Sequence, residues 1–424
     1  MKKYQLIVVG GGFSGVAAAV TAAKCGVETL IIEQSNCFGG AATNNLVNPF
    51  MPFWFQNQET GEKEYLSCGF FRKIISKLSA ANAILSDESI FDQEYLKLLL
   101  NDIVCESNVD ILFNTTLVGC RKEADNILSV NVHNKSGIQE FEAERFIDAT
   151  GDGDLAALSN VPFELGRKED GLCQPMTLCF RIGNIDNTKF HFDFDSWREI
   201  ESVYNQWKKE GKIDNPREGV LLFNTVCDTI MHFNTTRIVK HNPLDGFDIT
   251  DAEIKARKQA YDIFRLLKEN IRGFENSIML MTATRIGVRE SRRIIGKYQI
   301  TADDIINCTK FEDSIALGNY DIDIHNPAGT GTTHCYIKPG EYYSIPYRAL
   351  LPNINANNLL VVGRCISATH EAQAAIRIMP ICCCIGEAGG YASAVAVNNQ
   401  IFNYSAVDTK MLQKLLVDNG ARIF

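Results

Sequence analysis

The side chains best suited to acid–base and anion-binding chemistry lie in the second half of the sequence. His370 stands in the segment SATHEAQAAIR, and its imidazole can act as acid or base near neutral pH. Arg289 and Arg292 flank Glu290 in GVRESRR, and a guanidinium can hold a substrate carboxylate or oxyanion through two hydrogen bonds. His370, Arg289 and Arg292 are therefore the candidate catalytic residues.

Each of these candidates has a structural alternative. His370 could anchor its helix or pack on a ring, and the arginines could form a buried ion pair with Glu290. Strand-like alternation through GVRESRR would place Arg289 and Arg292 on different faces of that strand. Weaker candidates, for which a structural role is the simpler interpretation, are Arg237, His325, Tyr343 and Arg348.

Side chains of this kind can serve a bound cofactor, and the start of the sequence predicts a site for one. A short apolar run at residues 6–9 favours a buried strand, and an Ala-rich helix follows it. The turn between them, GGGFSG, fits G-x-G-x-x-G at Gly10, Gly12 and Gly15, with Phe13 and Ser14 inside the pattern. These glycines allow a tight turn, a close pyrophosphate and close packing of helix on strand, and the helix N-terminus faces the phosphates.

An acidic residue completes this pattern. Glu33 ends a second predicted strand, eighteen positions after Gly15. Its carboxylate can accept hydrogen bonds from both ribose hydroxyls of an adenosine, and it would repel a 2′-phosphate. An ordinary glycine-rich turn would not need this combination of strand, helix and acid, so we predict a cofactor that contains ADP.

Composition restricts the class of protein. A chain of 424 residues exceeds the size of a single core, so two domains are expected. The net charge of −9 argues against nucleic acid or an anionic membrane as partner, and no uninterrupted apolar run is long enough to predict a membrane span. The N-terminus enters the first strand without room for a cleavable signal. The 14 cysteines form no C-x-x-C pair and are interpreted as free thiols in a reducing cytoplasm, with no metal site.

The order of the predicted elements indicates an α/β fold. Two strands and their helices are followed by a third parallel strand near residues 109–114 and an antiparallel meander over 115–143, and a strand then leads into ATGDGD. We expect a Rossmann-like domain with a parallel sheet and a β-meander from residues 1–160 and 341–424, with a partly helical excursion at 50–90. Residues 161–340 change character and predict an inserted α+β substrate or cap domain.

Several of these segments together carry a family likeness. GGGFSG, Glu33, Gly39-Gly40 and ATGDGD resemble the FAD-dependent oxidoreductases of the glutathione-reductase-2 type, in which the chain leaves the FAD domain and later returns. RIGVRESRRIIGKYQIT, YSIPYRALLP and NNLLVVGRCISATHEAQAAIRIMPICCCIGEAGG are similar to one bacterial branch of that family, sometimes mislabelled as a xanthan lyase.

The resemblance implies FAD as the cofactor. The block that often reads Gly-Asp in this superfamily is Gly363-Arg364 here, so the usual carboxylate contact with the ribityl chain is absent, and Arg364 could reach a phosphate or pack structurally. A helix that begins near Pro380 could stabilise negative charge at the N1/O2 edge of a reduced flavin. Motif and resemblance together predict cofactor contacts at Gly10, Gly12, Phe13, Ser14, Gly15, Glu33, Gly39, Gly40, Thr43, Val118, Gly151, Gly363, Arg364, Arg377 and Pro380.

The leading hypothesis is a cytoplasmic FAD-dependent oxidoreductase. It would transfer a hydride between flavin N5 and a small polar metabolite, with an anionic metabolite as one option, and its electron partner and oligomeric state are open. The alternatives are a flavoprotein of the tRNA-modifying or thiazole-forming type, or a module that passes electrons to a partner protein. The acidic net charge weighs against tRNA.

Overall fold

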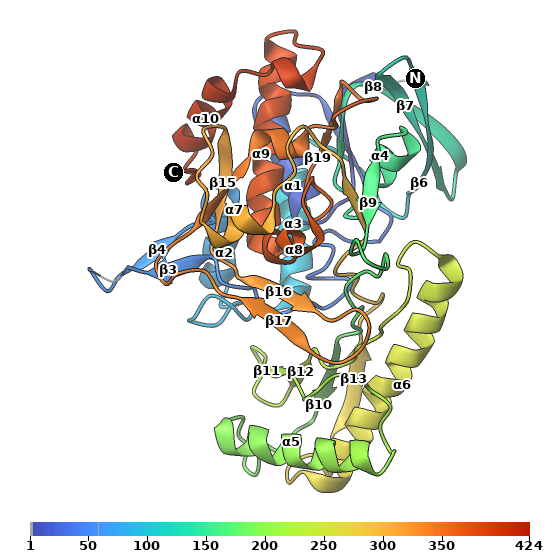
Figure 1. The fold of residues 1–424 in the computed structure, drawn as a ribbon, viewed down its shortest axis with the longest axis vertical. Coiled ribbons are helices and arrows are strands. Elements are labelled where there is room, and N and C mark those ends of the chain that lie inside the picture. The colour runs from blue at the N-terminus through green and yellow to red at the C-terminus, as the bar shows by residue number, and fades with distance from the viewer. Residues whose placement is uncertain (1–2, 58) are drawn as a thin grey trace.

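A seven-stranded sheet forms the centre of the larger body of the protein (Figure 1). The computed structural model describes residues 3–57 and 59–424. In spatial order, the sheet contains β5 (Asp110–Leu112), β2 (Thr29–Ile32), β1 (Lys3–Val9), β8 (Gly137–Asp148), β7 (Asn126–Asn134) and β6 (Thr116–Glu123), and β19 (Leu359–Val361) also pairs with β8. The strands β5, β2, β1, β8 and β19 run parallel, whereas β6, β7 and β8 form the antiparallel meander. The predicted fold class is confirmed.

The first strand shows why this sheet is buried on both faces. Leu6 and Val8 belong to one hydrophobic core, and Ile7 and Val9 belong to a second core on the opposite face. Alternate residues of a strand point to opposite faces, so a continuous apolar run is the expected sequence of a strand covered on both sides. The long strand β8 joins the two parts of the sheet, because its first half pairs with β7 and its second half with β1.

Two small-residue helices cross in the first core. α1 (Phe13–Lys24) packs against α9 (Met379–Asn398), in the centre of the larger body (Figure 1). A Cβ atom on Gly386 would overlap the backbone of Ser14, and one on Gly390 would collide with the carbonyl of Ala18. The structure therefore shows that these glycines serve the close packing of the two helices. α3 (Gln93–Cys105) and α2 (Phe70–Ala80) complete this side of the sheet.

A smaller sheet lies at the other end of the molecule (Figure 1). Its strands are β11 (Leu222–Asn224), β12 (Met231–Phe233), β10 (Phe180–Gly183) and β13 (Ile278–Thr282), and all of its pairs are antiparallel. α5 (Phe194–Lys209) and α6 (Gly246–Asn270) cover one face around a separate core that includes Phe180 and Phe233. This α+β unit comes from the middle of the chain, as the fold prediction required.

The remaining elements connect the two bodies. β16 (Ile322–His325) and β17 (Thr332–Cys335) form a hairpin that crosses between them (Figure 1). β15 (Ser314–Gly318) pairs with β18 (Tyr343–Pro346), and residues of β15 share the first core with α9. The division of the chain into domains stays a proposal, and this packing groups β15 with the larger body although the sequence assigned it to the cap.

Three further elements close the larger body. β9 (Phe163–Leu165) pairs with β14 (Arg292–Ile294), and α8 (His370–Ile376) immediately precedes α9. The short helices α4 (Asp154–Leu158) and α7 (Ala302–Ile306), the hairpin of β3 (Trp54–Gln56) and β4 (Lys63–Tyr65), α10 (Thr409–Asp418) and the 3₁₀ helices η1 (Tyr347–Leu350) and η2 (Tyr404–Ala406) complete the set of elements in the described residues. Of these, α7, α10 and the hairpin of β3 and β4 were not predicted.

Only α9, among the described residues, is long and apolar enough to cross a membrane by the criteria of length and composition. In this structure 94% of the relevant window is buried inside the protein, as expected for a core helix.

One carboxyl group lies within this apolar helix and should make stability depend on pH. Glu387 is 1% exposed and accepts a hydrogen bond from the backbone N–H of Phe70 at 3.0 Å. Burial raises the pKa of Glu387 from 4.5 to about 7. The unfolded chain therefore ionises first as the pH rises, and the folded state loses stability between about pH 4.5 and pH 7.

We expect Glu387→Gln to remove this loss. As the pH rises from 5 to 8, the unfolding free energy of the wild type should fall by about 3 kcal/mol relative to that of the variant. Urea unfolding at several pH values measures the difference, and Glu123→Gln on the exposed surface of β6 is the matched control. Parallel pH profiles for the wild type and Glu387→Gln would contradict the prediction.

Candidate functional site

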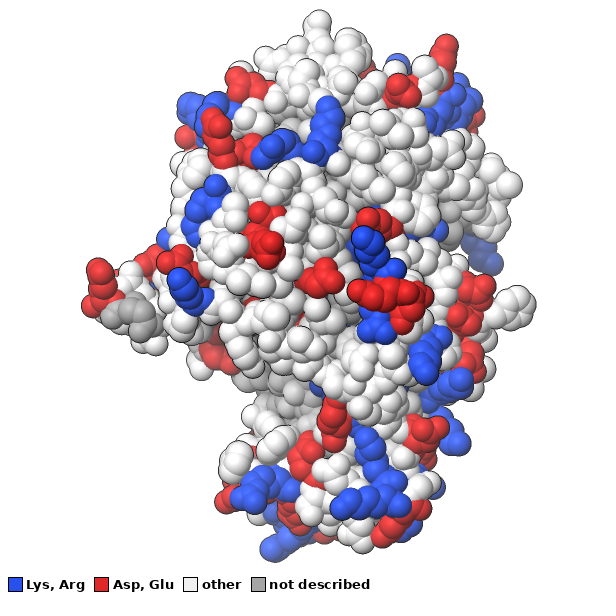
Figure 2. Space-filling view, in the orientation of Figure 1, with Lys and Arg blue, Asp and Glu red and all other residues white. Residues whose placement is uncertain are grey.

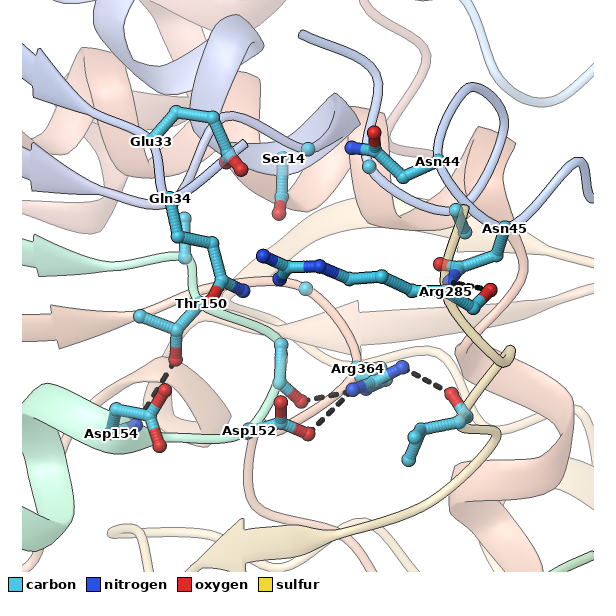
Figure 3. A pocket seen from close by; sticks show the side chains of 18 of the residues that line it. Ser14, Glu33, Gln34, Asn44, Asn45, Thr150, Asp152, Asp154, Arg285 and Arg364 are labelled. Carbon is cyan, nitrogen blue, oxygen red and sulfur yellow. Dashed lines mark hydrogen bonds and ion pairs between the residues drawn. The ribbon is translucent and has the colours of Figure 1, made fainter. Parts of the chain in front are cut away.

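A cavity of about 600 Å³ opens at the carboxyl ends of the parallel strands, where ligands bind in sheets of this kind (Figure 3). Val9 and Ile32 line it at the ends of β1 and β2, and Ala149 and Thr150 follow β8. The loop at residues 39–45, the segment at 285–288 and the start of α9 form its other walls. The glycine turn and the blocks far away in sequence thus meet around one space.

The glycine turn presents an uncapped helix to this cavity. Gly12 is the N-cap of α1, no side chain caps it, and the first turn has no acidic residue. Gly10 has a φ of +105°, and a Cβ there would overlap the carbonyl of Ala149, so only glycine fits. The free N–H groups and the helix dipole make this terminus a site for phosphate.

Glu33 lies at the opposite end of the cavity from the segment at residues 285–288 (Figure 3). Its Oε2 accepts a hydrogen bond from the N–H of Gly11 at 2.5 Å, and its Oε1 accepts from the N–H and hydroxyl of Ser35 at 2.8 and 2.6 Å. These bonds fix the carboxylate at the rim of the turn. Oε2 accepts only one of these bonds and keeps a free lone pair for a ribose hydroxyl.

The wall opposite the glycine turn comes from the middle of the chain. The amide nitrogen of Asn45 donates to the carbonyls of Arg285 and Ile286 at 2.9 and 3.0 Å, and the N–H of Thr284 donates to the carbonyl of Asn44 at 3.0 Å. These bonds tie the segment to the loop of the larger body. The side chain of Arg285 extends across the cavity (Figure 3), and within the described chain its guanidinium forms no hydrogen bond or ion pair.

Arg364 packs structurally around the ATGDGD turn. Its Nε donates to the carbonyl of Gly151 at 2.7 Å, its Nη2 pairs with Asp152 at 2.5 Å, and its Nη1 bonds to the carbonyl of Val288. Asp152 also accepts a hydrogen bond from Ser291 at 2.6 Å. Arg364 therefore joins the ATGDGD turn to the segment at residues 285–288, and it also borders the cavity.

The two acidic residues of this turn influence one another. Burial raises the pKa of Asp154, and the neighbouring carboxylates of Asp152 and Asp148 also raise it; together they bring this pKa to about 6. Arg292 opposes this shift, because its Nη1 donates to Asp154 at 2.8 Å and to the carbonyl of Asp152 at 3.0 Å. Arg292 is thus a partner of the turn and lies outside the cavity lining.

The structure places most of the predicted cofactor contacts around the cavity. Those that line it are Gly10, Gly12, Phe13, Ser14, Glu33, Gly39, Gly40, Gly151, Gly363, Arg364 and Arg377. Gly15, Thr43, Val118 and Pro380 do not line it. A Cβ on Gly15 would overlap the carbonyl of Gly10, so this glycine serves helix packing.

The other three absences have local causes. The hydroxyl of Thr43 donates to the carbonyl of Phe38 at 2.7 Å and so stabilises the loop. Val118 is 48% exposed on β6, and its neighbour Leu117 faces the cavity instead, because successive residues of a strand alternate. Pro380 is buried in the first turn of α9, where Met379 and Cys382 reach the cavity.

His370 has a partner that the sequence did not connect to it. Its Nδ1 lies 2.8 Å from Glu290, which is fully buried and also pairs with Arg293. Neither His370 nor Glu290 lines the cavity. The segment around Glu290 is not the strand that the sequence predicted, because β14 begins only at Arg292. The anchoring alternative is thus what the geometry of His370 favours over a direct catalytic role.

Arg289 occupies a different environment. Its Nη1 donates to the carbonyl of Pro175 and the hydroxyl of Thr177, both at 2.6 Å. Burial lowers the pKa of Arg289, and the positive charges of Arg377 and Arg217 also lower it; together they bring this pKa to about 9. Arg289 is partly buried and does not line the cavity itself. With Arg217, Arg237 and Arg377 it forms a group of arginines next to the end of the cavity where Arg377 lies.

The four weaker candidates divide in the same way. Arg348 forms a two-pronged ion pair with Asp313 at 2.9 and 3.1 Å, and the hydroxyl of Tyr343 donates to backbone carbonyls. Both have structural roles. Arg237 and His325 instead contact each other beside Arg289, and Nη2 of Arg237 lies 3.1 Å from Nδ1 of His325.

Several lining residues were not predicted at all. The polar ones include Gln34, Asn44, Asn45, Thr150, Asp152, Asp154, Glu253 and Arg285. Thr150 and Asp152 stand in the ATGDGD block, so the motif itself indicated their place. Arg285 stands four residues before Arg289, and no spacing rule marks which arginine of that segment faces the cavity.

The parallel sheet, the glycine turn and the acid after the second strand define a dinucleotide-binding enzyme of the Rossmann type. The chain belongs to the FAD dependent oxidoreductase family, whose model matches residues 5–416. The protein is therefore an FAD-dependent oxidoreductase, and its cofactor is FAD.

Individual relatives are more distant. The tRNA uridine 5-carboxymethylaminomethyl modification enzyme MnmG of Campylobacter fetus subsp. fetus (strain 82-40) is 27% identical over 231 residues. The alignment covers 45% of this chain and 36% of MnmG, so this chain spans little more than a third of that relative.

Solved structures with a similar course of the chain are remote in sequence. A geranylgeranyl bacteriochlorophyll reductase-like protein from Thermoplasma acidophilum has a TM-score of 0.48 and 12% identity, covering 100% of this chain and 85% of that chain. The p-nitrophenol 4-monooxygenase PnpA from Pseudomonas putida DLL-E4 has a TM-score of 0.46 and 11% identity, covering 99% and 85%. Likeness at this level carries no information on substrate.

The group of Glu290, Arg293 and His370 can be tested as a structural unit. Glu290→Gln removes the carboxylate that lies between Arg293 and His370, and it leaves the buried guanidinium of Arg293 with only the more distant and half-exposed Glu164, 3.5 Å away. We expect the unfolding free energy to fall by about 3 kcal/mol or more. Chemical unfolding measures this loss, with Glu371→Gln on the same helix as His370 as control. An unchanged unfolding free energy would show that the group does not stabilise the fold.

Proposed function

We propose that this protein transfers a hydride between FAD, held in the cavity described above, and a small polar metabolite. The observation that carries the proposal is the fit of the cavity to a dinucleotide. An uncapped helix N-terminus lies at its centre, a fixed carboxylate lies at one end, and the unpaired guanidinium of Arg285 reaches in from the opposite wall. When bound, FAD would supply the two-electron chemistry.

The chain's own residues would bind and orient the cofactor. The N–H groups at the start of α1 would donate to the pyrophosphate, and Arg285 would place its charge against the same phosphates. Glu33 would accept hydrogen bonds from the ribose of the adenosine. The start of α9, also without a side-chain cap, would turn its positive end toward the flavin beside Met379 and Arg377.

Finer assignments rest on the sequence blocks rather than on the family. The glutathione-reductase-2 type and the bacterial branch that the C-terminal blocks resemble are part of this proposal, as is a cytoplasmic location. A module that passes electrons to a partner protein is the non-catalytic alternative. It would show rapid flavin reduction by that partner and no turnover of small molecules.

The partial relation to MnmG favours one other function, a role in tRNA modification. The net charge of −9 opposes it, and on the face shown in Figure 2 lysines and arginines are interspersed with acidic residues. Filter binding with tRNA at two salt concentrations would decide between the functions. Tight, salt-sensitive binding would overturn our preference for a small-molecule substrate.

Arg285 offers a direct test of the proposed cofactor site. The wild-type protein should take up FAD and turn yellow, and Arg285→Gln should raise the Kd for FAD about tenfold or more, because a charge-assisted phosphate contact is lost. Quenching of FAD fluorescence on titration with apoprotein measures the Kd.

The matched control is Arg265→Gln, since Arg265 lies on the outer surface of α6 with a side chain that is 55% exposed. A colourless wild-type protein that takes up no FAD on reconstitution would refute the proposed function. An unchanged Kd for Arg285→Gln would refute only the role of that residue.

A further inference from the structure

Four arginines gather where the FAD cavity meets the cap. Arg377 lines the cavity just before α9 begins. One helical turn earlier, the side chain of Gln373 donates to the carbonyl of Arg289 at 3.0 Å, which brings these two arginines to the same place. Arg217 and Arg237 approach from the cap, and both act on Arg289 through their positive charge. The cluster is therefore continuous with the cofactor cavity at the Met379 end.

The cap side of this cluster is partly neutralised. Arg237 lies 3.3 Å from Glu218, and its Nη2 lies 3.1 Å from Nδ1 of His325. Nε2 of His325 in turn lies 3.5 Å from Asp323. Burial and the surrounding arginines lower the pKa of His325 well below its usual value, so this imidazole is neutral and adds no charge.

Arg289 and Arg377 have no such neutralisation. The side chain of Arg289 bonds to a carbonyl and a hydroxyl, neither of which carries charge. Across residues 3–57 and 59–424, no carboxylate forms an ion pair with Arg289 or Arg377, and the buried Nε of Arg377 and Nη1 of Arg217 have no hydrogen-bond acceptor. Arg289 and Arg377 are each partly buried. Cations that are largely withdrawn from water are normally paired, so this arrangement lacks anionic partners.

We propose that Arg289 and Arg377 bind a small dicarboxylate as the substrate, at the end of the cavity next to the start of α9. This inference rests on the proposed function and specifies its substrate class. Two unpaired guanidinium groups require two anionic groups, and the planar fork of a guanidinium matches a carboxylate through two parallel hydrogen bonds.

The experiment uses the FAD-loaded protein and simple anions as probes. Malonate, succinate, glutarate, acetate and inorganic phosphate are titrated at constant ionic strength, and the flavin absorbance spectrum and melting temperature are recorded. We expect at least one dicarboxylate to perturb the spectrum and bind at least tenfold more tightly than acetate. Tighter binding of phosphate than of every dicarboxylate would overturn the proposal in favour of a phosphorylated substrate.

Variants then assign the binding to these arginines. Arg289→Gln should weaken dicarboxylate binding about tenfold or more without changing the amount of FAD bound, whereas Arg289→Lys should have a smaller effect. Arg265→Gln should bind the dicarboxylate like the wild type. Should Arg289→Gln fail to fold, Arg377→Lys is measured in its place with the same expected weakening.

Two results would refute the inference: dicarboxylates that bind no tighter than acetate, or variants that bind them as tightly as the wild type. Uptake of FAD is read separately from its colour. Loss of colour would refute the proposed function, while a yellow protein without dicarboxylate binding would refute only the substrate class.

Discussion

The contact between α1 and α9 is the constraint on which the cofactor site depends. Gly386 and Gly390 leave no atoms between the two helices, so their backbones touch near Ser14 and Ala18. Ser14 lines the cavity, and so does Cys382, one turn before Gly386. The same contact therefore holds both helix N-termini at one cavity, and any side chain at Gly386 would separate them. Packing and anion binding are two results of one arrangement of small residues.

Charge is distributed unequally between the two halves of the site. Around the FAD cavity, most charged groups have partners: Arg364 pairs with Asp152, and Arg292 pairs with Asp154. Behind it, Glu290 balances Arg293 and His370. Toward the cap, the positive charges of Arg289 and Arg377 oppose one another, and no carboxylate within the described chain forms an ion pair with either arginine. A partly buried imbalance of this kind costs stability, and a ligand that restores neutrality would recover that cost.

The sequence predicted the lining of the cavity far better than the arrangement of the charged side chains behind it. Gly10, Gly12 and Glu33 act through the backbone or through local bonds, so their spacing reveals their role. Glu290 and His370 are 80 positions apart, and no local pattern connects them. Arg285, Arg289 and Arg292 share one segment that is mostly irregular, and irregular backbone has no period from which a side chain's direction follows. The packing of β15 against α9 is likewise set by tertiary contacts alone.

The topology also imposes an order on biosynthesis. The glycine turn at residues 10–15 leaves the ribosome early, but Gly363 and α9, which complete the same cavity, emerge more than 340 residues later. At typical rates of about 5–20 residues per second, the first strand waits roughly 20–70 s for its covering helix. During that interval the apolar faces of β1 and α1 have no α9 to cover them. The complete cavity therefore cannot form before Gly363 and α9 have emerged, and apolar surface that is exposed in the meantime is what chaperones bind.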